Sequence, residues 1–179
     1  MGDNNILEEV QKIYNDVSEW LKFLEAKHAA LFAVWTALLI AVVTADFFVE
    51  AIILWKAVLV IPILVGSMIN MISFIPFLNR CKFLRERCYQ KYKTSTDNIV
   101  FYQAIFSKTY QSNNSEEDKY KELLEEYFER EIDDKLTKDY IKQIVEVSTV
   151  ASIKAYLFSV AVKYTMAVSL LVIAGLIIA

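Results

Sequence analysis

Two groups of charged side chains in the sequence have the types and spacing needed to bind an anion. The larger one follows a long apolar block and is opposed only by Glu86; it contains Arg80, Lys82, Arg85, Arg87, Lys91 and Lys93. Such a run either anchors a membrane protein to anionic lipid or, where some side chains face a cavity, binds phosphate. The smaller group, Glu25-Ala26-Lys27-His28, places three polar side chains at the start of another apolar block. The second group either forms part of a binding site or consists of the polar residues that commonly gather at the ends of membrane spans.

A third charged residue, Lys163, lies eight residues inside the last apolar block. At about 1.5 Å per helical residue it would be about 12 Å beyond the start of that block. An ammonium group near the bilayer centre costs about 2.5–3.5 kcal/mol on insertion scales. Lys163 therefore either extends toward the interface or lines a polar interior.

Signatures of catalysis and of metal binding are missing from the sequence. There is no phosphate-binding glycine motif, because the three glycines, Gly2, Gly66 and Gly175, are scattered. The single histidine, His28, excludes a multi-histidine metal site, and Cys81 and Cys88 have neither zinc-site spacing nor the number for a disulfide framework. We predict no enzyme activity, no catalytic residue, no metal and no cofactor. A net charge of −3 gives no sign of nucleic-acid binding.

The composition of the 179 residues determines which elements can position these side chains. Hydrophobic residues make up 56 % of the chain although 23 % is charged, so the two kinds must be segregated into blocks. Three glycines and two prolines are too few for the turns of an all-β fold. The sequence predicts an all-α membrane protein with a sizeable polar part.

Three apolar blocks are long enough to cross a bilayer, which needs about 20 residues of helix. We predict spanning helices over residues 29–49, 57–79 and 155–179. Lys and Arg flank the cytoplasmic ends of spans, and here they crowd the segments before the first span and between the second and third. The N-terminus and residues 80–154 should therefore be cytoplasmic, and the C-terminus outside. Self-association is expected, because Lys163 and Asn70 are better tolerated in a protein interior than in lipid.

The polar segments read as helices too, so residues 1–179 form one predicted domain with a cytosolic helix over 1–28 and a helical insert over 80–154. Apolar residues recur every three or four positions from Ile6 to Leu24, and no breaker separates this amphipathic helix from the first span. The insert leads in the same way into the third span. Thr94–Asp97 suits an N-cap before a helix over 99–108. Ser115–Asp118 resembles a capping box, which would open a helix with one apolar face: Tyr120, Leu123, Leu124, Tyr127 and Phe128.

Three short motifs, taken in order, resemble the membrane-spanning effector family of bacterial Pycsar anti-phage systems. The first is Glu25-Ala26-Lys27-His28-Ala29, which leads into the first span. The second is Asp97-Asn98-Ile99-Val100-Phe101-Tyr102, and the third is Gln143-Ile144 followed by Ser148 and Ile153-Lys154-Ala155-Tyr156. The resemblance covers the chain from about residue 5 to its end. It implies two N-terminal spans, a helical cytosolic insert and a C-terminal span.

The resemblance also implies a function. Such effectors sense cyclic UMP or cyclic CMP, made by a partner pyrimidine cyclase after phage infection, and then impair the bacterial inner membrane so that the infected cell stops growing or dies. This chain would then be a multi-pass inner-membrane protein with a cytoplasmic N-terminus and no enzymatic activity. The alternatives are a constitutive membrane scaffold or small channel subunit without a nucleotide ligand and, less favoured, a membrane enzyme.

The residues of this sequence are compatible with a cyclic mononucleotide, which carries one negative charge. Lys27, Lys154 or an arginine of residues 80–87, such as Arg80, can neutralise that charge. The base needs a flat apolar partner, which Phe101 or Tyr102 can supply, and Asn98 offers a donor and an acceptor to a pyrimidine edge. Glu25 completes the predicted ligand-binding set.

Overall fold

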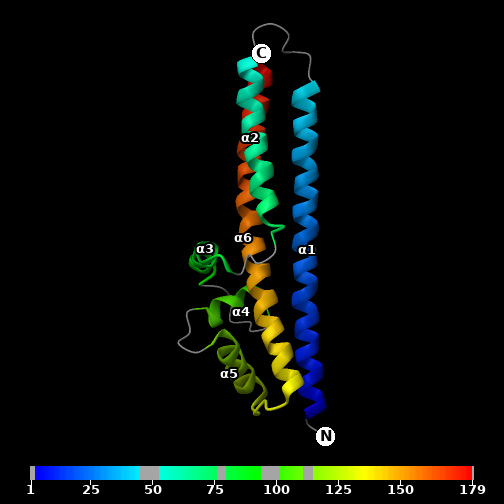
Figure 1. Cartoon of the computed structure of the whole chain (residues 1–179), viewed down its shortest axis with the longest axis vertical. Helices are drawn as coiled ribbons and strands as arrows, with labels where there is room; N and C mark the ends of the chain where they lie inside the picture. Colours follow the sequence, from blue (N-terminus) through cyan, green and yellow to red (C-terminus); the bar gives the residue numbers. More distant parts are fainter. Residues whose placement is uncertain (1–2, 45–52, 76–79, 94–100, 111–114, 179) are drawn as a thin grey trace. The chain divides into compact units, whose positions relative to one another are not determined.

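The computed structural model describes residues 3–44, 53–75, 80–93, 101–110 and 115–178, and all regular structure in these ranges is helical (Figure 1). The six helices are α1 Asp3–Thr44, α2 Ile53–Ile72, α3 Lys82–Tyr92, α4 Tyr102–Thr109, α5 Glu116–Phe128 and α6 Lys135–Ile178. The prediction of an all-α chain is confirmed for the described residues. The predicted cap at 94–97 and the site residue Asn98 lie outside them.

The chain divides into two compact units, which are described separately below. The first unit contains Met1–Leu24 and Phe77–Ala155, and the second contains Glu25–Pro76 and Tyr156–Ala179. The long helices α1 and α6 each contribute residues to both units. Their continuity confirms the two predictions that amphipathic polar segments run unbroken into apolar ones.

The core of the first unit is formed by one face each of α1, α4, α5 and α6. Its fully buried members include Val10 and Val17 of α1, Ile105 of α4, Leu124 of α5 and Ile144 of α6. Burying each large aliphatic side chain contributes about 1.5–3 kcal/mol, which explains why the periodic apolar positions of residues 5–28 determine the buried face of α1.

The short helix α4 packs against both α3 and α5 within this unit (Figure 1). It begins at Tyr102, because Phe101 has extended backbone angles (φ −85°, ψ 128°) and serves as the N-cap residue. The predicted start at residue 99 is therefore wrong. The aromatic run at 101–102 determines the start, since the Tyr102 ring enters the core and Phe101 only packs against it.

Helix α5 begins at the predicted capping box. The Ser115 hydroxyl accepts a hydrogen bond from the Asp118 backbone N–H at 3.1 Å and donates one to the Asp118 carboxylate at 2.6 Å. Tyr120 and Leu124 are buried as predicted. Tyr127, by contrast, is 61 % exposed, so the predicted apolar face is not buried at this residue. Its ring instead packs edge-on against Phe128.

The second unit consists of α2 with the C-terminal part of α1 and of α6, and α2 runs antiparallel to α1 (Figure 1). Two stretches, Ile6–Thr44 and Lys135–Ala174, are long and apolar enough to cross a membrane, and Val58–Ile72 forms a shorter apolar helix. Large apolar side chains are exposed on all three helices, among them Ile40, Met68 and Leu170. Lipid is the solvent that suits such a surface.

The end of α2 differs from the predicted span over 57–79, with which it overlaps over residues 57–72. After Ile72, the backbone N–H groups of Ser73, Phe74 and Ile75 bond to carbonyl groups three residues back. Ile75 precedes Pro76, and a residue before proline is disfavoured in the helical region. The helix therefore tightens and stops before the proline.

Trp35 is the centre of the second unit's core and touches both other helices. Its ring is fully buried and lies 5.9 Å, centroid to centroid, from that of Tyr164 on α6. Gly66 of α2 faces the ring so closely that an added Cβ atom would be 2.3 Å from Trp35 Cζ2. Tyr164 also donates its hydroxyl hydrogen to the Pro62 carbonyl oxygen at 3.1 Å. Lys163, one residue earlier on α6, is exposed.

Candidate functional site

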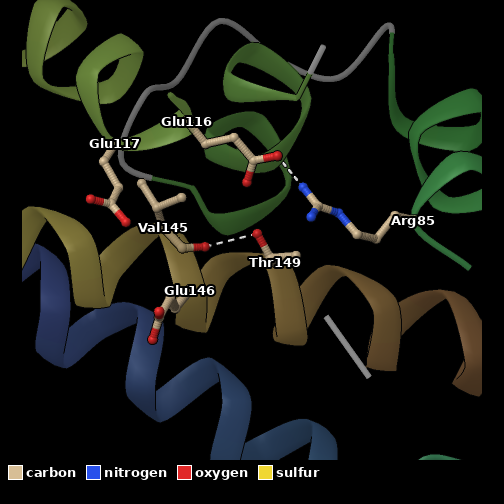
Figure 2. Close-up of a pocket in the computed structure, with 6 residues that line it drawn as sticks. All are labelled: Arg85, Glu116, Glu117, Val145, Glu146 and Thr149. Atoms are coloured by element: carbon tan, nitrogen blue, oxygen red, sulfur yellow. Dashed lines mark hydrogen bonds and ion pairs between the residues drawn. The ribbon is translucent and has the colours of Figure 1, made fainter. Parts of the chain in front are cut away.

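The first unit contains a cavity of about 280 Å³ lined by charged and polar side chains (Figure 2). Three helices supply the lining residues, which are Arg85 of α3, Glu116 and Glu117 of α5, and Val145, Glu146 and Thr149 of α6. Local structure determines where each group lies. The Ser115 cap starts α5 so that both glutamates are in its first turn. Val145 and Thr149 are four residues apart and share one face of α6.

Among the described residues that line the cavity, Arg85 is the one cation, and it forms an ion pair with Glu116. Its guanidinium carbon lies 5.2 Å from the centroid of the Tyr110 ring, a cation–π contact that fixes the plane of the group. The Nε atom of Arg85 is buried and has no hydrogen-bond partner among the described residues. Arg85 is therefore held in place while retaining an unused donor.

The glutamates of the cavity differ in surroundings. Glu117 lies 3.9 Å from the Lys142 ammonium group, at the outer limit of an ion pair. Figure 2 shows Glu116 and Arg85 pointing toward each other, while the Glu146 side chain turns away from that pair. The Thr149 hydroxyl donates to the Val145 carbonyl oxygen at 2.8 Å, which leaves its lone pairs as acceptors. The cavity thus offers many acceptors and one guanidinium group.

An aromatic cluster in the same unit contains two of the predicted site residues. The rings of Phe101 and Tyr102 are 4.7 Å apart, and each centroid lies 5.9 Å from that of Trp20 on α1. Tyr102 is buried in the core, and burial raises the pKa of its hydroxyl despite the hydrogen bond that Gln103 donates to it. Phe101 is only partly buried, so of the two it is the one accessible to a ligand.

The other predicted site residues are distributed between the two units. In the first, Lys154 is buried on α6 and Arg80 is exposed just before α3. In the second, Glu25 is exposed, and the partly buried Lys27 has its Nζ atom 5.5 Å from the centroid of the Phe158 ring. Each of these four charged residues has an interaction partner. None of the predicted site residues that the structure describes is among the residues that line the cavity.

The second unit contains a buried polar cluster, formed by His28, Asn70 and Ser73, that the sequence did not predict. The His28 Nδ1 atom lies 2.7 Å from Asn70 Oδ1, and the Asn70 side-chain amide donates to the His28 carbonyl oxygen at 2.8 Å. Ser73 donates to the Asn70 carbonyl oxygen at 2.7 Å, and all three residues are buried. In the sequence, His28 directly precedes the first apolar block and Asn70 lies inside the second. These positions alone do not indicate that the two side chains bond to each other.

A metal site would need a different set of ligands. Among the residues that the structure describes, no group of three or more His, Cys, Asp or Glu side chains is arranged to hold a metal ion. Two of the cavity glutamates, Glu116 and Glu117, are instead engaged with Arg85 and Lys142 respectively. What the cavity can do is bind an organic ligand that brings both an anion and hydrogen-bond donors.

Comparison with known proteins gives one result. No curated protein and no solved structure matches the chain. One family does match, over residues 9–179, and is described as the Pycsar effector protein domain. The match includes both units and nearly all of the chain. With its described residues all helical and its two long apolar helices, this chain belongs to the Pycsar effector protein domain family and has an anti-phage effector role.

Proposed function

We propose that this effector senses a cyclic pyrimidine mononucleotide through its first unit and then impairs the bacterial inner membrane through its second unit. The observation that carries the proposal is the family match over residues 9–179, which covers both units. The polar cavity in one unit and the exposed apolar helices of the other supply the two surfaces that the function needs. The protein acts by binding and is not an enzyme.

The first unit has the groups that a cyclic mononucleotide requires. The single negative charge of its phosphate needs a cation, for which Lys154, Arg80 and Arg85 are the candidates in the first unit; the remaining candidate, Lys27, lies in the second unit. The base needs an apolar surface, and the partly buried ring of Phe101 in the aromatic cluster provides one. The ligand is made by a pyrimidine cyclase.

The proposed topology has three spans, with the N-terminus and residues 80–154 in the cytoplasm. Its support is the excess of Lys and Arg between residues 80 and 93. Reporter fusions at residue 1, within 110–116 and after 179 test it. Cytoplasmic reporter activity at both ends of the chain would refute the three-span arrangement.

Binding must favour one arrangement of the spanning helices over another, because a ligand shifts an equilibrium only by its differential affinity for the two states. Helices α1 and α6 are shared by both units, which gives a covalent connection between the binding unit and the membrane. We also propose self-association, since a charge such as the exposed Lys163 is better covered by a second copy than by lipid.

The experiment compares cells that express the effector alone with cells that also express a pyrimidine cyclase. A potential-sensitive dye should report an intact membrane in the first case and depolarisation with growth arrest in the second. A catalytically inactive cyclase is the control. Equal depolarisation in all three strains would contradict nucleotide gating, and no depolarisation in any strain would favour a constitutive scaffold.

A further inference from the structure

We propose that the cavity of the first unit is the nucleotide site, that Arg85 binds the phosphate there, and that the site prefers cyclic CMP to cyclic UMP. The inference rests on the proposed function and adds the position and the base preference of the receptor. It selects Arg85 among the candidate cations because Arg85 lines the polar cavity of the first unit.

Binding of the phosphate by Arg85 depends on the Arg85–Glu116 ion pair. A guanidinium group can bind two oxygens of a phosphate at once, and the unused Nε donor adds to this capacity. The side chains of Arg85 and Glu116 are 24 % and 31 % exposed, so the pair is partly hydrated and opens at small cost. Glu116 is thus a built-in competitor, which the phosphate displaces toward solvent. The Tyr110 ring keeps Arg85 in position when Glu116 leaves.

The size of the cavity is suited to one mononucleotide. Ligand pockets for small molecules have volumes of about 300–1,000 Å³, and about 280 Å³ is just below the smallest of these. A dinucleotide needs more room than this. The lining residues that the structure describes also include one guanidinium group, which matches a ligand with a single phosphate.

The preference for cytosine over uracil depends on the excess of hydrogen-bond acceptors around the cavity. Glu117 presents a carboxylate, and Thr149 presents lone pairs because its hydrogen is donated to the Val145 carbonyl. Cytosine offers its exocyclic amino group as a donor, and a carboxylate is the side chain that accepts from that group. Uracil has a carbonyl oxygen at the same place, which a carboxylate repels. We assign Glu117 as the residue that discriminates between the two bases.

The experiment measures binding of cyclic CMP, cyclic UMP and cyclic AMP to the purified full-length protein in detergent by calorimetry. Wild-type protein should bind cyclic CMP about tenfold or more tightly than cyclic UMP. Arg85→Ala should weaken cyclic CMP binding by about 10–100-fold, since a charge-assisted contact is lost. Glu117→Gln, which places an amide donor opposite the base, should reduce or reverse the preference for cytosine. Lys119→Ala and Glu126→Gln, both on α5, are matched controls and should bind as wild type does.

Glu116→Gln separates a binding role from a structural one. Because this variant removes the competitor of the phosphate, it should bind cyclic CMP more tightly than wild type, a gain that a merely damaged fold cannot give. If wild-type protein binds neither pyrimidine nucleotide, the proposed function itself fails. If it binds one of them and Arg85→Ala and Glu116→Gln leave affinity unchanged, the function stands and the cavity is not the site. Tighter binding of cyclic UMP would overturn the base assignment.

Discussion

Replacing Gly66 by alanine tests the packing of the second unit at its tightest point. The new Cβ atom would lie 2.3, 2.5 and 2.7 Å from the Cζ2, Cη2 and Cε2 atoms of Trp35, well inside van der Waals contact. The indole ring cannot simply turn aside, because it is fully buried and packs against Tyr164. Either the ring or the backbone of α2 must therefore shift.

Two effects of opposite sign determine the magnitude. Overpacking a tight core by one methyl group costs about 1–3 kcal/mol. Alanine in place of a mid-helix glycine stabilises the helix by about 0.8–1.0 kcal/mol, because alanine has the higher helix propensity. The net expectation is a loss of up to about 2 kcal/mol. Trp35→Phe in the same chain removes the benzo ring that contains the atoms Cζ2 and Cη2, so the double variant should lose less than the sum of the two single losses.

The assay is reversible unfolding of the purified protein in mixed micelles, followed by helical circular dichroism. Met68→Ala is the control, since Met68 is two residues from Gly66 on the same helix but 68 % exposed. A Gly66→Ala protein that is more stable than wild type, or a double variant whose losses add, would refute the contact between α1 and α2 described here.

Three further predictions follow from single contacts. Ser115→Ala removes the cap of α5 and should destabilise the first unit by about 1 kcal/mol in a denaturant titration; an unchanged midpoint would contradict the capping role. At pH 8 a maleimide should label the exposed Cys81 and spare Cys88, whose burial raises the pKa of its thiol from 9.0 to about 12. Because this folded-state pKa is above the unfolded one, the stability due to Cys88 is fully present below about pH 9 and is lost as the pH rises toward 12. Asn70→Ala breaks the bond to His28 and should cost about 0.6–1.7 kcal/mol in the micelle assay, whereas equal stability would show that the buried pair contributes nothing.

The elements that could be predicted from sequence are those determined by local signals. The continuity of α1 and of α6 follows from apolar periodicity without a breaker, and the start of α5 follows from Ser115 and Asp118, which are in direct contact. The start of α4 was placed three residues early because a run of aromatic residues gives no local boundary. There, burial of Tyr102 in the tertiary core determines where the helix begins.

The candidate site was beyond local signals, because its residues come together only through packing. Arg85, Glu116 and Thr149 lie on three helices, and the sequence indicates only that residues 80–93 are basic and 116–131 are acidic. Pairing of Arg85 with Glu116, 31 residues away, could not be distinguished from many other pairings of opposite charge. The same holds for His28 and Asn70, which are 42 residues apart.

Leakage from proteoliposomes tests the central claim most directly. Purified full-length protein is reconstituted into vesicles of bacterial lipids that contain a potassium gradient and a potential-sensitive dye, and nucleotide is added outside and inside the vesicles. The vesicles should hold a stable potential without nucleotide and lose it rapidly with cyclic CMP or cyclic UMP, but not with cyclic AMP. A potential that persists with every nucleotide, or that collapses equally without any, would contradict a nucleotide-gated membrane effector.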